Sequence, residues 1–338
     1  MDVLDRRRFL QCMGWAAGLA MGGGTCAATA AGSFPAHPLS LLVPYPAGGS
    51  SDAAARIIAD SLEGRLGQTV AVENVGGATG LIGSQKFLDS PADGYTFLQG
   101  TINEVFLVPA LNEAARYKPN DFSLAAPLAD INLVLLVRKD IPVDTLDEFL
   151  DYAGRLDRDV GLTYATSGVD SLFHLMGEAL AARLNLPFLH VPYKGVSAAL
   201  QDLAGGQIDF SLQAYQSRFE GMREQGRIKI LSSFSTVLPP PMQHIPLISQ
   251  SRLVPDFEYT IGEGYYFRPQ VPQDRVAVLR KAIGEVLNVP GIRTRLESEG
   301  RIVARSIDSQ DAADQIFARQ RRMVAELFKR MARKPIDG

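Results

Sequence analysis

The turn "VPYPAGGSSDAAAR", residues 43–56, constrains the fold of this chain more than any other stretch. An apolar strand-like run precedes it, two prolines, two glycines and two serines form it, and a helix-like run follows from Asp52. Such a turn presents backbone N–H groups at the start of a helix, and these groups can hold an anion. The same order of strand, Val-Pro-Tyr, glycine and helix returns at Val191 in "FLHVPYKGVS". Two such corners predict two α/β lobes that face a shared cleft.

Strand-like and helix-like runs alternate from Leu39 to about Leu212, which is typical of α/β layers. We expect a strand at 39–43, a first helix that Gly67 closes, and a helix at 172–184. After residue 239 the chain is rich in loops, and it becomes helical again from Asp274. We predict an α/β fold in which helices flank a mostly parallel sheet in each lobe. The expected boundaries are 34–132 plus 240–338 for lobe 1 and 133–239 for lobe 2.

The first thirty residues have the character of an export signal. Three arginines at 6–8 precede a short, weakly apolar run, an order that resembles the twin-arginine signal. The run is too short to span a bilayer, which takes about 20 apolar residues. We expect cleavage near Ala30 and a periplasmic location, with a lipid anchor on Cys26 as the competing interpretation. Both cysteines, Cys12 and Cys26, lie in this leader, so the mature chain is predicted to have no thiol and no disulfide.

The composition of the mature chain excludes several function classes. The leader carries three arginines and two aspartates, so the remaining chain has a formal charge of −4, which argues against nucleic acid as a partner. Four scattered histidines and no mature cysteine predict no metal site and no cofactor. A serine, histidine and acid could be assembled from Ser167, His174 and Asp170, but their spacing is wrong and no Gly-x-Ser-x-Gly motif is present. We therefore expect no catalytic residues.

Four turns rich in Gly, Ser and Thr and poor in charge stand out as a candidate ligand site. They are Tyr45 to Asp52, Gly76 to Gly80, Ala165 to Ser171 and Pro192 to Gly195. A helix N-terminus carries about half a positive charge, so several such ends can bind a carboxylate without a permanent counter-ion. The turns predict a small carboxylate as the ligand.

The order of these segments resembles the tripartite tricarboxylate transporter receptor family, also called the Bug family. The matching stretches are "VPYPAGGSSDAAAR", "VENVGGATGLIGSQKFLDSPADGYTFLQG", "YATSGVDSLFHLMGEAL" and "HVPYKGVSAALQDLAGGQIDFSL". The resemblance implies a monomeric type II Venus-flytrap receptor that closes on a small carboxylate and delivers it to the membrane subunits of a permease. A receptor that serves a periplasmic signalling partner is the alternative, followed by an enzyme that acts on carboxylates.

The candidate ligand-binding residues come from the resemblance and from the turns. Residues that match the family's loops are Tyr45, Gly48, Gly49, Ser50, Asp52, Thr166, Ser167, Gly168, Ser171, His174, Tyr193, Lys194 and Gly195. Ala47, Ser51 and Thr79 join them as members of the turns. The family commonly has Arg-Pro-Gly-Ala-Gly where this chain has Val-Gly-Gly-Ala-Thr at residues 75–79.

Single residues of this set have a structural interpretation beside the functional one. Asp52 fits an N-cap of the first helix, which would give it an indirect part in binding. A lone histidine such as His174 is more often structural than a ligand. Lys194 is either a solvated lysine or a counter-charge for a second carboxylate. Tyr45 and Tyr193 either wall the cleft or pack at strand ends. We expect a hydroxyl of Ser50 or Ser51 to reach the ligand.

Overall fold

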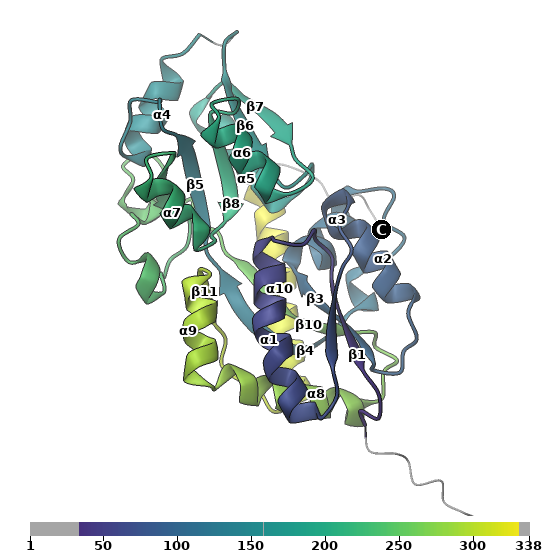
Figure 1. The fold of residues 1–338 in the computed structure, drawn as a ribbon. Coiled ribbons are helices and arrows are strands. Elements are labelled where there is room, and N and C mark those ends of the chain that lie inside the picture. The colour runs from purple at the N-terminus through teal and green to yellow at the C-terminus, as the bar shows by residue number, and fades with distance from the viewer. Residues whose placement is uncertain (1–33, 158, 331–338) are drawn as a thin grey trace, which may run out of the picture. The chain divides into compact units, whose positions relative to one another are not determined.

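Two β-sheets organise the chain in the computed structural model, which describes residues 34–157 and 159–330 (Figure 1). The six-stranded sheet has the order β11-β4-β10-β3-β1-β2 and the five-stranded sheet has the order β7-β6-β8-β5-β9. We call each sheet with its helices a lobe, the six-stranded one first. The predicted export signal at 1–30, with its cleavage site and both cysteines, lies outside the described residues.

The strands are mostly five or six residues long. Those of the first lobe are β1 Leu39–Val43, β2 Val70–Asn74, β3 Thr96–Thr101, β4 Ser123–Ile131, β10 Ile261–Phe267 and β11 Arg301–Val303. Those of the second lobe are β5 Leu133–Arg138, β6 Leu162–Thr166, β7 Phe188–Pro192, β8 Phe210–Ala214 and β9 Ile228–Ser233.

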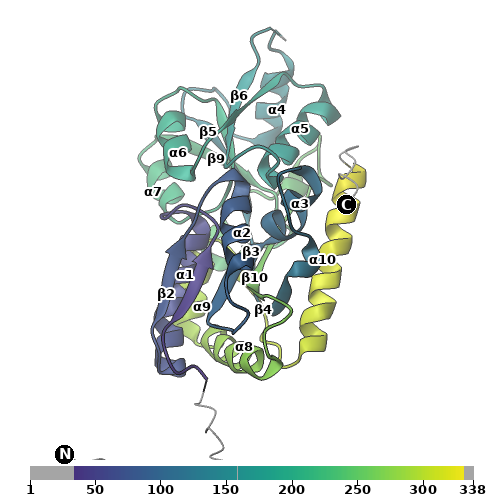
Figure 2. The same cartoon turned by 90° about the vertical axis from the view of Figure 1, so that its right-hand side faces the viewer.

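The helices lie on the faces and edges of these sheets (Figures 1 and 2). They are α1 Ser50–Leu66, α2 Leu81–Asp89, α3 Val108–Leu111, α4 Leu146–Gly154, α5 Leu172–Leu184, α6 Val196–Ala204, α7 Arg218–Glu224, α8 Gln273–Leu287, α9 Pro290–Ser298 and α10 Gln310–Arg330. A π-helical turn, η2 Asn103–Leu107, precedes α3, and 3₁₀ turns are η1 Ala78–Gly80, η3 Pro119–Asp121, η4 Pro240–Met242 and η5 Ile248–Gln250. Within the described ranges no helix combines the length and apolar character that a membrane crossing requires.

The two α/β lobes are confirmed, but the prediction of mostly parallel sheets was wrong. Strand β1 pairs in parallel with β2 and β3, and β6 pairs in parallel with β7 and β8. In the first sheet, β10 pairs antiparallel with β3 and β4. In the second sheet, β5 pairs antiparallel with β8 and β9. The reason is that these strands do not belong to βαβ units, since β5 enters its sheet directly from the other lobe. Both sheets are therefore mixed.

The passage from β4 to β5 takes place at Asn132. The largely apolar run at residues 131–137 is divided between two strands, because β4 ends at Ile131 and β5 begins at Leu133 in the other sheet. The Asn132 N–H and side-chain amide both donate to the Gly300 carbonyl, at 2.9 and 3.0 Å, and its own carbonyl accepts from the Tyr215 N–H at 2.9 Å. Asn132 therefore joins three distant segments where the chain crosses between lobes.

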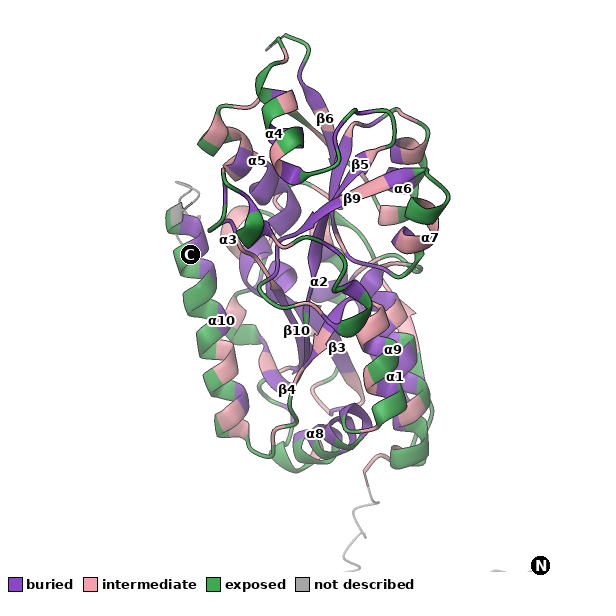
Figure 3. Ribbon diagram, turned by 90° about the vertical axis from the view of Figure 1, so that its left-hand side faces the viewer, coloured by how far each residue is buried: buried purple, intermediate pink, exposed green. Residues whose placement is uncertain are grey.

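The core is built on the two-residue period of the strands. In β5, Leu133 and Leu135 belong to the cluster that contains α4 and α5, whereas Val134 and Leu136 pack with α6 and α7. The first sheet is covered likewise, with α1 and α8 on one face and α2 on the other. Figure 3 shows the strands buried between helices with exposed outer faces. The sheets are thereby fixed on both faces, and only their strand ends are free to form a site.

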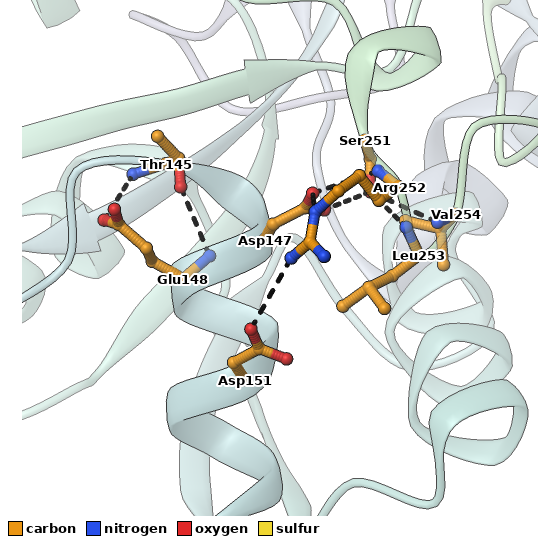
Figure 4. A network of polar contacts seen from close by, with 8 residues as sticks. All are labelled: Thr145, Asp147, Glu148, Asp151, Ser251, Arg252, Leu253 and Val254. Carbon is orange, nitrogen blue, oxygen red and sulfur yellow. Dashed lines mark hydrogen bonds and ion pairs between the residues drawn. The ribbon is translucent and has the colours of Figure 1, made fainter.

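A network of polar contacts joins α4 of the second lobe to residues 251–254, which follow β9 in the chain (Figure 4). Thr145 caps α4, accepting from the Glu148 N–H. The Asp147 carboxylate accepts from the Ser251 hydroxyl at 2.5 Å, from the Arg252 N–H at 3.0 Å and from its guanidinium at 3.1 Å. These bonds hold the loop at residues 251–254 on the second lobe. The predicted lobe boundary at 239/240 stays a prediction, and these contacts favour a boundary near residue 260.

Candidate functional site

The first turn opens α1 two residues earlier than expected. Gly49 is the N-cap residue and Ser50 the first helical residue, so the prediction that Asp52 caps the helix was wrong. The Asp52 carboxylate instead reaches back to the Gly48 N–H at 2.8 Å and pairs with Arg56 at 3.0 Å. Burial disfavours the charged form, but hydrogen bonds from Arg56 and Gly48 outweigh it and lower the pKa of Asp52. The negative charge of Asp52 is therefore compensated by Arg56, and the Gly48 N–H already has a hydrogen-bond acceptor.

The serines of the first turn are almost fully buried. Ser50 is 8% exposed and Ser51 is 9% exposed, whereas Ala47 lies on the surface and Gly49 is half-buried. The Ser50 hydroxyl has no hydrogen-bond partner among the described residues. Most buried hydroxyls in proteins have a hydrogen-bond partner, so the Ser50 hydroxyl stays a candidate ligand contact.

The second turn carries Thr79 in a left-handed conformation, with φ 55°. A β-branched residue is strained there, and the family commonly has glycine at this position. The Thr79 hydroxyl donates to the Val169 carbonyl at 2.8 Å, and a Cβ at Gly168 would lie 2.7 Å from that hydroxyl. The second turn, from the first lobe, therefore touches the third turn, from the second lobe.

The third turn is held by its own side chains. Ser171 caps α5 by accepting from the His174 N–H at 3.2 Å, and its hydroxyl donates to the Gly168 carbonyl at 2.8 Å. The Thr166 hydroxyl lies 2.7 Å from His190 Nε2 and is fully buried. Ser167, which lies between Thr166 and Ser171 in the sequence, is half-buried. Ser167 therefore stays a candidate ligand contact, since its side chain is not fully buried.

His174 has contacts on both ring nitrogens. Its Nδ1 accepts from the Asp170 N–H at 3.1 Å and its Nε2 lies 3.3 Å from a Glu178 carboxylate oxygen. Its ring stacks on His190 with centroids 4.0 Å apart. Burial, with a further contribution from His174, lowers the pKa of His190 to about 4. These contacts favour the structural interpretation of His174, as a residue that holds the third turn.

The fourth turn opens α6, of which Gly195 is the N-cap residue. The Tyr193 hydroxyl donates to Asp202 at 2.5 Å, and burial together with this carboxylate raises the pKa of Tyr193 to about 12. Lys194 is exposed. A Cβ at Gly195 would lie 3.8 Å from the Pro46 ring, and a Cβ at Gly76 would lie 2.7 Å from the same ring. Pro46 of the first turn therefore lies against the second turn and near Gly195 of the fourth turn.

Two residues next to the site were missed in the sequence. Glu104 is fully buried, and its carboxylate accepts from the Tyr45 hydroxyl at 2.8 Å, from the Thr101 hydroxyl at 2.8 Å and from the Thr101 N–H at 2.5 Å. Burial raises the pKa of Glu104 to about 7, against these hydrogen bonds. The neighbouring Asn103 accepts from the Leu172 N–H at 3.0 Å, at the start of α5. The one signal in the sequence is a lone acid within "INEVFLV".

Tyr45 joins the first turn to this buried carboxylate. Burial and the nearby Glu104 raise the pKa of Tyr45 well above its usual value, so its hydroxyl stays neutral and a donor. The hydrogen bond from Tyr45 to Glu104 favours packing at the strand end over a place in the wall of the cleft.

The arrangement brings together turns from both lobes but no metal ligands. In the described part of the chain, no group of three His, Cys, Asp or Glu side chains could hold a metal ion. A pocket of about 540 Å³ lies beside Ile102, Leu172 and the end of α10, and none of the candidate residues lines it. What the four turns share is neutral donors and two adjacent helix starts, those of α1 and α6. Such a site attracts anions.

The comparisons with known proteins agree on one family. Residues 54–331 match the model of the tripartite tricarboxylate transporter family receptor. The structure of the periplasmic binding protein BugD is 28% identical, with a TM-score of 0.80, and the match covers 89% of this chain and 99% of that one. MatC from Rhodopseudomonas palustris, solved with bound malate, is 26% identical with a TM-score of 0.78, covering 87% and 99%. Another R. palustris protein, solved with adipate, is 25% identical with a TM-score of 0.81, covering 90% and 100%.

Proposed function

Because this chain belongs to the tripartite tricarboxylate transporter receptor family, a family of solute-binding proteins and not of enzymes, we propose that it binds a small carboxylate between its two lobes. The observation that carries the proposal is the meeting of the four turns. Pro46 and Thr79 of the first lobe lie against Gly195 and Gly168 of the second. Relatives of this fold hold malate and adipate, which supports a carboxylate as the ligand class.

The ligand would be held by neutral donors at the starts of α1 and α6. The Ser50 hydroxyl, buried and without a partner in the described ranges, is proposed as the first contact, with Ser51, Thr79 and Ser167 beside it. A carboxylate gains from the partial positive charge of both helix ends. Asp52, Ser171 and His174 are proposed to act indirectly, by fixing the turns that carry these donors.

Binding is proposed to proceed by closure of the lobes about the crossing at Asn132. The bond from Thr79 to Val169 and the bond from Leu172 to Asn103 both run between lobes, and opening would break them. A ligand that contacts both lobes binds the closed state better and shifts the population toward it. The receptor would then deliver its ligand, in the periplasm and after removal of the leader, to the membrane subunits of the transporter.

A thermal-shift screen of the mature chain against small carboxylic acids, including malate and adipate, tests this proposal. A ligand at 100 times its dissociation constant stabilises by about 2.7 kcal/mol, a shift that is easily measured. Neutral amides of the same acids should give none. A screen in which no carboxylate stabilises the protein would contradict the proposal.

The variant Ser50→Ala tests the proposed contact. The hydroxyl has no partner before binding, so the variant should keep the unfolding free energy of the wild type. It should lose one hydrogen bond to the ligand, about 0.5–1.5 kcal/mol, or roughly two- to tenfold in affinity. Ser61→Ala, in the same helix, is the matched control and should bind as the wild type does. Equal affinities for both variants would remove Ser50 from the site.

A further inference from the structure

A buried ion pair lies under the start of α1. Arg301, in β11, donates through Nε to a Glu263 carboxylate oxygen at 2.9 Å, and both side chains are 0% exposed. The two strands that carry them, β11 and β10, are separated in the sheet by β4, so the guanidinium reaches across a strand. Neither residue belongs to the candidate site found in the sequence.

The ion pair is connected to the first turn by two further bonds. Arg301 Nη2 donates to the Ser50 carbonyl at 2.9 Å. The Gln99 side-chain amide donates both to the Ser51 carbonyl at 2.8 Å and to Glu263 at 2.9 Å. The first two carbonyls of α1 are thereby held by side chains of two strands, Arg301 of β11 and Gln99 of β3, and Glu263 of β10 joins these two side chains. Their N–H groups and hydroxyls, on the other side of the same residues, belong to the proposed ligand site.

Stability alone is a weak reason to keep such a pair. Removing two charges from water costs more than their attraction returns in many proteins, and well-packed apolar pairs are often as stable. An ion pair does fix geometry, because the planar guanidinium has donors in set directions. Here those donors go to Glu263, to the Glu299 carbonyl at 3.3 Å and to the Ser50 carbonyl.

The turn that carries Arg301 is also attached to the second lobe. The Glu299 carboxylate accepts from the Ser217 hydroxyl at 2.6 Å and from its N–H at 3.3 Å. The Gly300 carbonyl accepts from Asn132 at the crossing between lobes, and a Cβ at Gly300 would lie 2.6 Å from Tyr215. This turn therefore contacts the first turn of α1, the crossing and the second lobe.

We propose that Arg301 is a positioning residue for ligand binding, which fixes the first turn of α1 through the Ser50 carbonyl and links that turn to the second lobe through Glu299 and Gly300. The inference deepens the proposed function and rests on it, since it assigns the support of the same carboxylate site. Arg301 itself does not touch the ligand.

The double variant Arg301→Met with Glu263→Leu tests this role, because it leaves no unpaired charge in the core. Arg280→Met is the matched control, since Arg280 is also buried and donates to the Ala125 carbonyl at 2.8 Å, away from the turn. Gln99→Met is a second, milder variant that keeps the ion pair and removes the bonds of the Gln99 amide to the Ser51 carbonyl and to Glu263.

Two measurements are made on each protein: hydrogen exchange of the amides at residues 53–55 without ligand, and the affinity for malate and adipate by calorimetry. We expect exchange at least tenfold faster and affinity at least tenfold weaker in the double variant, a smaller change of both in Gln99→Met, and neither change in Arg280→Met. Unchanged exchange overturns the positioning role, and faster exchange with unchanged affinity overturns its part in binding. If the wild type binds neither acid, the proposed function fails for these acids while the exchange data still decide the positioning role.

The link to the second lobe has its own variant. Ser217→Ala removes the hydroxyl that bonds Glu299, and we expect about two- to threefold faster exchange at residues 53–55. Exchange equal to that of the wild type would overturn the link through Glu299.

Discussion

Replacing Glu104 by glutamine should make the stability of the protein less dependent on pH. The buried carboxyl has its pKa raised from 4.5 to about 7, so the folded state holds a proton that the unfolded state releases between these values. Stability from the neutral form is therefore complete below pH 4.5 and is lost as the pH rises through 7. Glutamine has the shape of the neutral acid, and its amide can bond the same hydroxyls of Tyr45 and Thr101.

The magnitude follows from the size of the shift. One pKa unit corresponds to 1.36 kcal/mol, so a shift from 4.5 to about 7 amounts to roughly 3 kcal/mol. The unfolding free energy of Glu104→Gln minus that of the wild type should rise by about this amount between pH 4 and pH 8. Other titrating groups cancel in the difference, because both proteins share them.

Urea unfolding at fixed pH values from 4 to 8 measures this difference. Tyr45→Phe is an internal check, because it removes a hydrogen bond that favours the charged carboxylate, and it should move the loss of stability to higher pH. A difference that is flat or falls with pH would refute the reasoning. It would mean that the three hydrogen bonds to Glu104 outweigh its burial.

Two further predictions concern packing and closure. Gly177→Ala should destabilise by about 1–3 kcal/mol in urea unfolding, since the new Cβ would lie 2.3 Å from the Tyr164 ring, whereas Gly221→Ala, with open space around it, should cost nothing. Thr79→Ala should favour the open form without ligand, because it loses the bond to Val169, worth about 0.5–1.5 kcal/mol. A radius of gyration in solution equal to that of the wild type would contradict this.

Local signals in the sequence predicted the local elements well. The helix expected at 172–184 coincides with α5, and the strand expected at 39–43 coincides with β1. Both are bounded by residues that act on their own neighbours, such as Ser171 as a cap and Gly67, whose φ of 65° ends α1. Strand β10, "IGEGYYF", was missed because two glycines and a glutamate are typical of a loop. Its glutamate, Glu263, is buried beside Arg301 and Gln99, which both donate to it.

In the candidate site, too, the residues with local signals could be predicted and those with distant partners could not. The four turns could be found in the sequence because glycines, serines and helix starts lie within a few residues of one another. Glu104, Asn103 and Arg301 could not, since each takes its meaning from a distant partner. Glu104 bonds Tyr45 across 59 residues, and Arg301 bonds Ser50 across 251 residues. The error at Asp52 was local, because a carboxylate three residues after the N-cap residue Gly49 can also accept from a backbone N–H at this end of the helix.

The contact of Pro46 with two glycines restricts how the ligand loops can diverge during evolution. A side chain at position 76 would collide with the Pro46 ring, and at position 195 it would just touch it. The family commonly has proline where this chain has Gly76, so a relative with that proline must place residue 46 differently, and these loops should vary as a coupled pair. A change of solute preference that begins in one loop will then require a compensating substitution in its neighbour.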